Sequence, residues 1–205
     1  MFFLSVLLAA PGYAATAELE RLDEFRIARA VERMVAATRK IYTAEVARKL
    51  TADGYGADAD YHDIRGHVPL PVRFVHMIAD EFYQINDKEI SVALKSKYFI
   101  NPENRLVTDK DKEAWSYFEE LQKTPKGMQK VHSTPYLYRE SSFLGDYLVY
   151  VGADLGTDQG CVNCHSRNEY EKSVAERRKE YGVKGQPILK LDYMMGLVVI
   201  RVQIL

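Results

Sequence analysis

The sequence predicts an α+β domain, with helices first along the chain and an antiparallel sheet last. Two observations predict this class. Apolar side chains recur every three or four residues through most of the first 123 residues, and from residue 129 onward they recur every second residue. The chain of 205 residues, 47% apolar and 28% charged, is long enough to bury one core. We expect a leader over residues 1–14, a helix and linker over 15–56, and the main domain over 57–205.

The first residues have the pattern of an export signal. Phe2 to Ala10 form an apolar stretch of the length typical of a signal peptide, and it is too short to span a bilayer. Gly12 and Ala14 are small residues that suit cleavage after Ala14, although no Lys or Arg precedes Arg21. We therefore expect a signal peptide or the remnant of a membrane anchor. The mature protein would then be periplasmic or secreted, or tethered to the membrane through this segment.

Residues 18–50 have the pattern of one long helix. No Pro or Gly interrupts the segment, and apolar side chains recur with helical spacing on the face that we expect to be buried. These side chains are those of Ile27, Val31, Met34, Val35, Ile41, Tyr42 and Val46. Such a helix is longer than most helices of globular proteins. It is therefore a candidate for projecting from the domain, or for pairing with a second copy of the chain in a homodimer.

Four segments are expected between the long helix and the sheet: a loop over 51–71, a helix over 71–84, a strand over 89–95 and a helix over 108–123. The loop is rich in Gly, Asp and Pro, and Pro71 suits the first turn of the helix that follows. The stretch "EISVALK" alternates apolar and polar residues, as a half-buried strand does. Thr108 and Asp111 fit a capping box at the start of the last helix.

The sheet is expected mainly from the second half of the chain, over residues 130–140, 146–153, 187–193 and 196–205. The first two segments would form a hairpin around "ESSFLGD", and the last two would form a second pair. A loop and a short helix would connect the two pairs. This connection contains the residues that bear most directly on function.

Both cysteines of the chain lie in that connection, in the stretch "CVNCH", at Cys161 and Cys164, with His165 directly behind them. In a c-type haem, two cysteines form thioether bonds with the two vinyl groups, and the adjoining histidine binds the iron as proximal ligand. The two-residue spacer matches the separation of the vinyl groups. Covalent attachment takes place outside the cytoplasm, which agrees with the export signal at the other end of the chain. The sequence therefore predicts one covalently bound haem c.

Three other kinds of site can use a pair of cysteines. A zinc site needs four N or S ligands, and here His62, His67, His76 and His132 would have to complete a single cysteine cluster. A dithiol redox site opens a helix directly after a buried strand, whereas the lead-in "GADLGTDQG" looks like a polar loop. A disulfide across two residues would be strained. Each alternative fits these residues less well than haem c does.

Several stretches, taken in order, resemble one known family: "DYHDIRGHVPLPVRFV", "VALKSKYFINPEN", "KEAWSYFEEL", "CVNCH" and "GLVVIRVQI". Over residues 57–204 the chain is similar to the PAS-like domains that carry a single covalently bound haem c. These domains occur as periplasmic sensor regions of bacterial kinases, cyclases and chemoreceptors, and as free secreted haem proteins. The resemblance implies an antiparallel sheet of about five strands, with helices on one side and the haem between them. It also implies attachment at Cys161 and Cys164, with His165 as the proximal ligand.

The resemblance leaves the distal side of the iron open. In relatives the distal ligand is a cysteine, a methionine or water, and this chain has no third cysteine. Met77, His67 and His62 are rival candidates, since Met77 lies beside the apolar stripe of the second helix and the two histidines lie in the loop before it. A core methionine and solvated histidines would give the same pattern, and water is a further candidate. His76 shares a face with charged side chains, so we expect it to be exposed.

Two functions follow from these expectations. In the first, a change of redox state, or a diatomic ligand such as NO, CO or O₂, alters haem coordination, and the long helix passes the change on. In the second, the protein is a soluble periplasmic electron carrier for a redox partner protein, which the lack of an output domain after the last strand favours. The net charge of −1 gives no reason to expect nucleic acid as a partner. No acid–base constellation indicates an enzyme.

Overall fold

The computed structural model describes residues 18–20, 22–58, 61–99, 101–168, 176, 179–184 and 189–204. The expected leader over residues 1–14 lies outside this part of the chain. The helical elements are α2 (Asp23–Ile41), the π-helical turn η1 (Tyr42–Ala47), α3 (Arg48–Ala52), α4 (Pro71–Ile85), the 3₁₀ turn η2 (Pro102–Asn104), α5 (Asp109–Gln122), α6 (Pro125–Val131) and α7 (Gln159–Asn168). The strands are β1 (Gly56–Asp58), β2 (His67–Pro69), β3 (Ile90–Lys95), β4 (Tyr136–Ser142), β5 (Gly145–Leu155) and β6 (Met194–Gln203).

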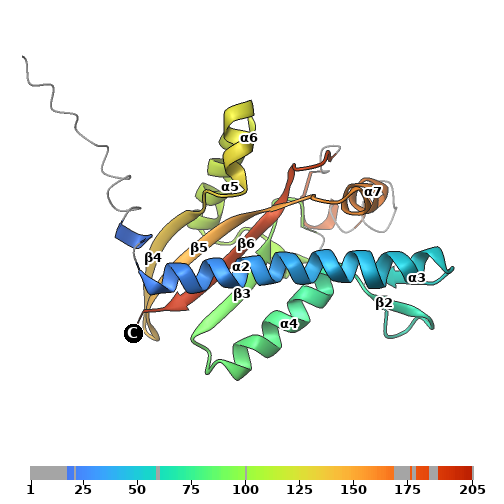
Figure 1. Ribbon diagram of the computed structural model, residues 1–205, viewed down its shortest axis with the longest axis horizontal. Coiled ribbons are helices and arrows are strands. Elements are labelled where there is room, and N and C mark those ends of the chain that lie inside the picture. The colour runs from blue at the N-terminus through green and yellow to red at the C-terminus, as the bar shows by residue number, and fades with distance from the viewer. Residues whose placement is uncertain are drawn as a thin grey trace, which may run out of the picture.

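The main sheet has the strand order β3-β6-β5-β4, and every neighbouring pair is antiparallel (Figure 1). The last strand of the chain, β6, therefore lies between β3 and β5, where Ile200 pairs with Val92 on one side and Tyr150 on the other. The short strands β1 and β2 form a separate parallel pair. This arrangement confirms the predicted α+β class.

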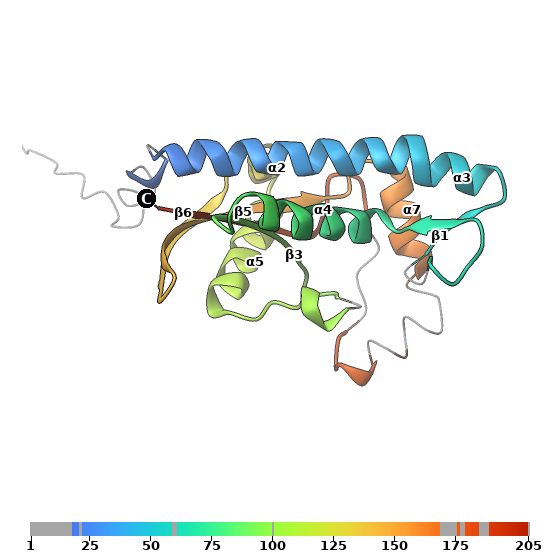
Figure 2. The same cartoon turned by 90° about the horizontal axis from the view of Figure 1, so that it is seen from below.

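Helices cover both faces of the sheet, and Figure 2 shows α2 and α5 on opposite sides of it. On one face, Phe25 and Ala28 of α2 and Val75 of α4 pack on alternate side chains of β5 and β6. On the other face, Trp115 and Phe118 of α5 pack on the intervening side chains of the same strands. The resemblance had implied helices on one side only. The difference arises because both faces of β5 and β6 are apolar and each must be buried.

The long helix is continuous, as predicted, and part of the predicted stripe faces the core: Val31 and Val35 pack against it and Tyr42 is buried. Phe25 and Ala28 are buried, while Ile27, Met34 and Ile41, which we had expected to face the core, are 42%, 67% and 61% exposed. Both sets of side chains have helical spacing, so the periodicity does not indicate which of the two is buried. Because α2 lies against the sheet along its length, it is part of the core of the described residues (Figure 1).

The remaining differences between the predicted and the observed elements arise because strands pair with segments that are distant in the sequence. The expected loop over 51–71 contains β1 and β2, and the expected start of a strand at residue 130 is the end of α6. Strand β5 continues to Leu155, through residues with loop-like composition, because β6 pairs with them. Residues 189–193, expected in a strand, form a turn, so the main sheet has four strands within the described chain where about five were expected.

The predicted helix starts are confirmed. Pro71 occupies the first turn of α4. At α5 the Thr108 hydroxyl accepts from the backbone N–H of Asp111 at 3.0 Å, and the Asp111 carboxylate accepts from the backbone N–H of Thr108 at 3.0 Å. No helix in the described chain is both long enough and apolar enough to cross a bilayer.

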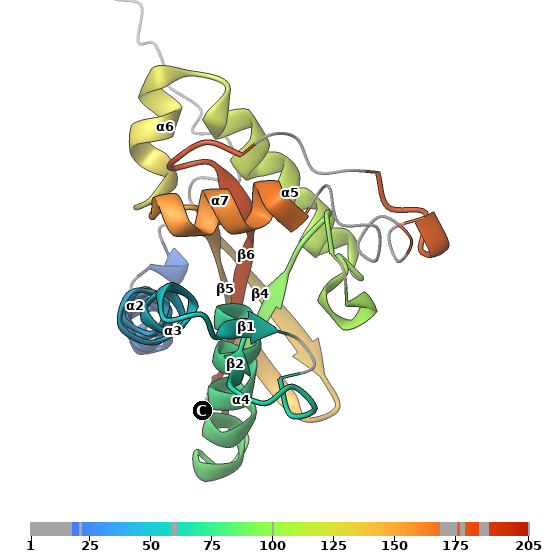
Figure 3. The same ribbon diagram turned by 90° about the vertical axis from the view of Figure 1, so that its right-hand side faces the viewer.

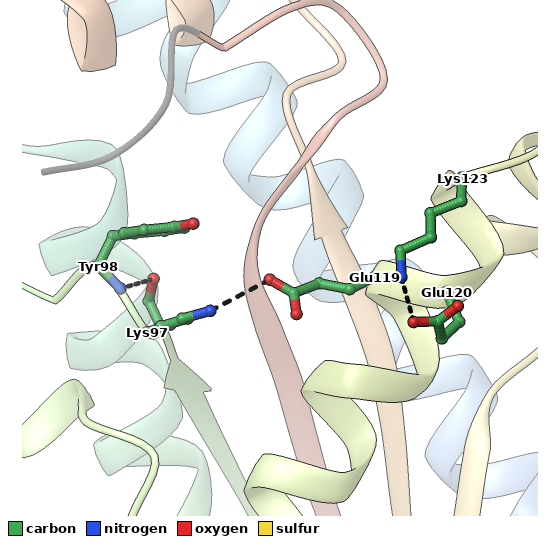
Figure 4. Close-up of polar contacts among 6 residues, drawn as sticks. Lys97, Tyr98, Glu119, Glu120 and Lys123 are labelled. Carbon is green, nitrogen blue, oxygen red and sulfur yellow. Dashed lines mark hydrogen bonds and ion pairs between the residues drawn. The ribbon is translucent and has the colours of Figure 1, made fainter. Parts of the chain in front are cut away.

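A surface ion pair connects α5 to the segment after β3, as Figure 4 shows. Lys97 Nζ lies 3.4 Å from a carboxylate oxygen of Glu119, and both side chains are largely exposed. Nearby, Glu120 and Lys123 form an ion pair within one turn of the chain. Exposed pairs of this kind add little stability, so the burial of Trp115 and Phe118 holds α5 in place.

Candidate functional site

The cysteine motif lies in the first turns of α7, directly after β5. Between the two elements is a turn whose Asp158 accepts hydrogen bonds from the backbone N–H of Gly160 at 2.7 Å and of Cys161 at 3.0 Å. Asp158 therefore caps the helix at its positive end. His165 follows Cys161 by four residues, which places the two on one side of α7. The side chain of Cys164 lies outside the part that the structure describes.

The Cys161 thiol is free and half-buried beside Val162, Leu189 and Met195. Burial raises the pKa of this thiol, and the opposing effect of the Arg39 guanidinium is smaller. Dithiol redox catalysis uses a thiolate with a lowered pKa. The lead-in is a strand as far as Leu155 and then a short turn, so it is only partly the expected polar loop, and the raised pKa of Cys161 is the stronger argument against a redox site.

Two ion pairs connect the long helix to the lead-in of α7. Arg39 of α2 pairs with Asp154 near the end of β5, and both side chains are largely buried, with 16% and 11% exposure. Arg39 also donates to the backbone oxygen of Leu155 at 3.3 Å. Arg48 of α3 lies 3.8 Å from Asp158, at the surface. The residues that position Cys161 therefore touch the long helix at two points.

The π-helical turn η1 lies between these two points. Its first residue, Tyr42, is buried, stacks on Phe74 of α4 at 4.1 Å between ring centroids, and donates to the backbone oxygen of Pro69 at 2.7 Å. Turns of this type insert one extra residue into a helix and occur often at functional sites. Through Tyr42 the long helix also contacts β2 and α4.

The structure brings two of the three distal candidates together. The Tyr61 ring lies 3.9 Å from the ring of His62, and its hydroxyl donates to the Met77 sulfur at 3.5 Å. Met77 is 41% exposed on α4. His67 lies in β2, opposite Gly56, and its ring covers that glycine so closely that a Cβ there would be 2.3 Å from Nε2. The Nδ1 atom of His67 is buried and has no hydrogen-bond partner among the described residues.

Figures 2 and 3 place α7 at the same end of the molecule as α3, β1 and β2. His67 belongs to β2, and the segment that follows β1 carries His62. The candidates for the proximal and distal ligands therefore come from elements that gather at one end. A free thiol at Cys161, a histidine one turn later and an unsatisfied imidazole nitrogen at His67 fit the ligands that a haem c requires.

His76 differs from the prediction. It is half-buried, its Nε2 is buried with no hydrogen-bond partner in the described chain, and burial lowers its pKa. The charged residues beside His76 in the sequence predicted an exposed side chain, but the structure buries its Nε2 atom. No group of three or more His, Cys, Asp or Glu side chains gathers into a metal site within the described residues.

Comparison with known proteins identifies one family and one solved structure. A family model with the description Tll0287-like matches residues 17–203. The crystal structure of the cyanobacterial heme-protein Tll0287 is similar at 14% sequence identity and a TM-score of 0.47, over 96% of this chain and 98% of that chain. No curated protein matched.

Proposed function

The chain belongs to the Tll0287-like family, and from that premise we propose that it is an exported protein with one covalently bound haem c that senses redox state or a small diatomic ligand. The observation that carries the proposal is the stretch from Cys161 to His165 on α7. The protein after which the family is named is described as a heme-protein. We propose no catalytic activity.

Cys161 and Cys164 would hold the haem through thioether bonds, and His165 would bind the iron. When bound, the haem supplies an iron that changes oxidation state and binds diatomic molecules. The protein positions these residues through the Asp158 cap and through the strand pairing that ends at Leu155. Burial raises the pKa of the Cys161 thiol, which favours its protonated form over the thiolate.

Met77 is our first choice for the distal ligand, with His67 and His62 as rivals. Its thioether is exposed and is oriented by the Tyr61 hydroxyl, so a bound haem would cover an apolar side chain. A methionine opposite a histidine raises the reduction potential relative to two histidines.

Three variants separate the candidates: Met77→Leu, His67→Leu and His62→Leu. We expect Met77→Leu alone to lower the reduction potential and to change the ferric absorption spectrum. The same change in His67→Leu or His62→Leu, with Met77→Leu unaffected, would assign the ligand to that histidine.

The sensing role is supported by the contacts between α7 and the long helix. A change of iron ligation that moves α7 would act on Asp154 and Asp158, which pair with Arg39 and Arg48 on either side of η1. The change could then reach α2 over its whole length. An electron carrier has no need of such a connection.

Gas binding and hydrogen exchange distinguish the sensor from the electron carrier, which is the alternative function. We expect the ferrous protein to bind CO or NO rapidly and reversibly, and the amides of η1 to exchange at different rates in the free and bound forms. A haem that stays six-coordinate in both redox states, with identical exchange in η1, would favour the carrier.

Export to the periplasm or beyond, or tethering to the membrane, is proposed from the sequence of residues 1–14. We also propose that the long helix pairs with a second copy of the chain. Its outward face exposes Ile27, Met34 and Ile41 at seven-residue intervals, with Ala30 and Ala37 between them, as in a coiled-coil seam.

The charges along this seam favour parallel helices. Arg26, Arg33 and Lys40 line one flank, of which Arg33 and Lys40 also line a cavity beside the sheet, and Glu45, which pairs with Lys49 of its own chain, lies at the end of the other flank. A parallel pair sets the basic flank beside the flank that carries Glu45, whereas an antiparallel pair sets the basic flank against itself.

A further inference from the structure

A cavity of about 360 Å³ lies between α2, the carboxyl end of β5 and the start of α7. Its walls are partly apolar, with Val35 of α2, Ala153 of β5 and Val198 of β6 among them, and Cys161 lines it from α7. Cavities of this size hold small molecules. The charges and hydroxyl groups of the lining indicate which class of small molecule this cavity would bind.

The wall formed by α2 is rich in cations. Arg29, Arg33, Arg39 and Lys40 all line the cavity. Arg39 is paired with Asp154, but Arg29, Arg33 and Lys40 form no ion pair within the described part of the chain. These cations are spread along the helix, since Arg33 and Lys40 are seven residues and thus about 10 Å apart along its axis.

The acidic groups of the cavity are already engaged. Glu32 accepts a hydrogen bond from the Tyr150 hydroxyl at 3.0 Å, and burial raises the pKa of Glu32 against the smaller opposing effects of Tyr150, Arg29 and Arg33. With Asp154 and Asp158 it makes three carboxyl groups in the lining against the four cations. Asp154 pairs with Arg39, and Asp158 pairs with Arg48. His132 at the rim has Asp192 3.9 Å from its Nε2. The cavity therefore has an excess of positive charge.

One hydroxyl in this wall has no partner. Thr43 Oγ1 is buried, lines the cavity and makes no hydrogen bond to any described residue. A buried hydroxyl without a partner costs stability, so it indicates a group that completes the site. Thr43 lies next to Lys40 along the helix face, at one end of the row of cations.

We propose that this cavity binds a short dicarboxylate, with one carboxylate held by Arg29 and Arg33, the other by Lys40 and the Thr43 hydroxyl, and the hydrocarbon chain against Val35 and Val198. Arg39 remains paired with Asp154, and this ion pair forms the buried end of the cavity. The proposal goes beyond the haem-based function: Cys161, which we propose as a haem attachment residue, also lines the cavity, but α2, η1 and β6 supply the groups that would contact the dicarboxylate.

Calorimetric titration of the exported protein with succinate, glutarate and adipate at constant ionic strength tests the proposal. We expect saturable binding with an optimum in chain length, and none with 1,4-butanediol, which lacks the charges. Arg33→Gln and Lys40→Gln should each weaken binding by about tenfold or more, as expected for loss of a charged hydrogen bond. Arg26→Gln, on the same helix but outside the cavity, should leave binding unchanged.

Thr43→Val is the most informative variant. It removes a hydroxyl that has no partner in the unliganded protein, so we expect a melting temperature that is equal or higher together with weaker dicarboxylate binding. If Thr43 had only a structural role, its replacement would lower the melting temperature and would leave dicarboxylate binding by the folded protein unchanged. Absence of saturable binding by any of the three acids would overturn the proposal, as would equal binding by wild type, Arg33→Gln and Lys40→Gln. Calorimetry does not depend on haem, so neither outcome bears on haem attachment.

Discussion

At the scale of single residues, the inner side of α2 contains polar groups where an amphipathic helix would have apolar ones. Glu32 lies over Gly152 of β5, so closely that a Cβ at that glycine would be 2.5 Å from the carboxylate. The glycine thus makes room for the acid, and Tyr150 donates a hydrogen bond to it. A buried carboxyl group is stabilised in its neutral form, which gives this site a specific dependence on pH.

Glu32→Gln should stabilise the protein at neutral pH. Burial raises the pKa of Glu32 in the folded protein above its value in the unfolded chain, so the folded state favours the protonated acid. That contribution is complete below pH 4.5 and is lost as the pH rises through the folded pKa. Glutamine keeps an acceptor for Tyr150 without the charge, so we expect the melting temperature to rise by about 2 °C at pH 7.5.

Thermal unfolding at pH 4.5 and at pH 7.5 checks this expectation. The difference between variant and wild type should shrink at the lower pH. Glu81→Gln, at an exposed position of α4, is the matched control and should have no effect at either pH. A Glu32→Gln protein that melts below wild type at pH 7.5 would show that the ionised acid is stabilising.

At the scale of elements, the long helix shows what the sequence could and could not predict. The absence of Pro and Gly predicted its length, but not the π-helical turn at Tyr42. At that turn Tyr42 contacts Pro69 and Phe74, which lie 27 and 32 residues further along the chain. The buried stripe was predicted only in part for a related reason, since the position of the sheet decides which apolar side chains of the helix face it. At the π-helical turn and at the buried stripe, contacts with distant segments decide the structure more than the local sequence pattern does.

The two ion pairs between this helix and the lead-in of α7 should differ in their contribution to stability. Arg39→Ala leaves Asp154 buried without its partner, so we expect a loss of about 3 kcal/mol or more in the free energy of unfolding. Arg48→Ala removes an exposed pair with Asp158 and should cost about 0.5 kcal/mol or less.

Urea denaturation of the two variants beside wild type measures this difference. Similar losses for both would mean that Asp154 is solvated in the variant, or that Asp158 depends on Arg48 for more than its charge. Either result would remove the basis for giving Arg39 the larger part in joining α2 to α7.

At the scale of the whole molecule, the α+β class and the family were predicted from the sequence, and both are confirmed. A short helix at the cysteine motif was also predicted, but the strand that leads into it as far as Leu155 was expected to be a polar loop. The helices on both faces, the parallel pair of β1 and β2, and the cluster of His62 and Met77 around Tyr61 were not predicted. These features depend on which distant segments meet, and a single sequence carries no direct record of that.

Pairing of two copies through α2 predicts a concentration-dependent dimer. Met34 is the most exposed residue of the apolar stripe, so Met34→Glu should place a charge at the centre of the seam and give a monomer. Sedimentation velocity over a range of concentrations measures this. Phe143→Glu changes an exposed apolar residue at the β4–β5 turn, away from α2, and should leave the dimer intact. A wild-type protein that is monomeric at all concentrations would contradict the pairing.

We propose above all that Cys161 and Cys164 hold one haem covalently. The most direct measurement is the intact mass of the protein, exported from cells that have a haem-attachment system, together with its pyridine haemochrome spectrum. We expect a mass increase of one haem, a c-type spectrum, and haem that stays with the protein in acidified acetone. An unchanged mass, with any haem lost to the solvent, would contradict it.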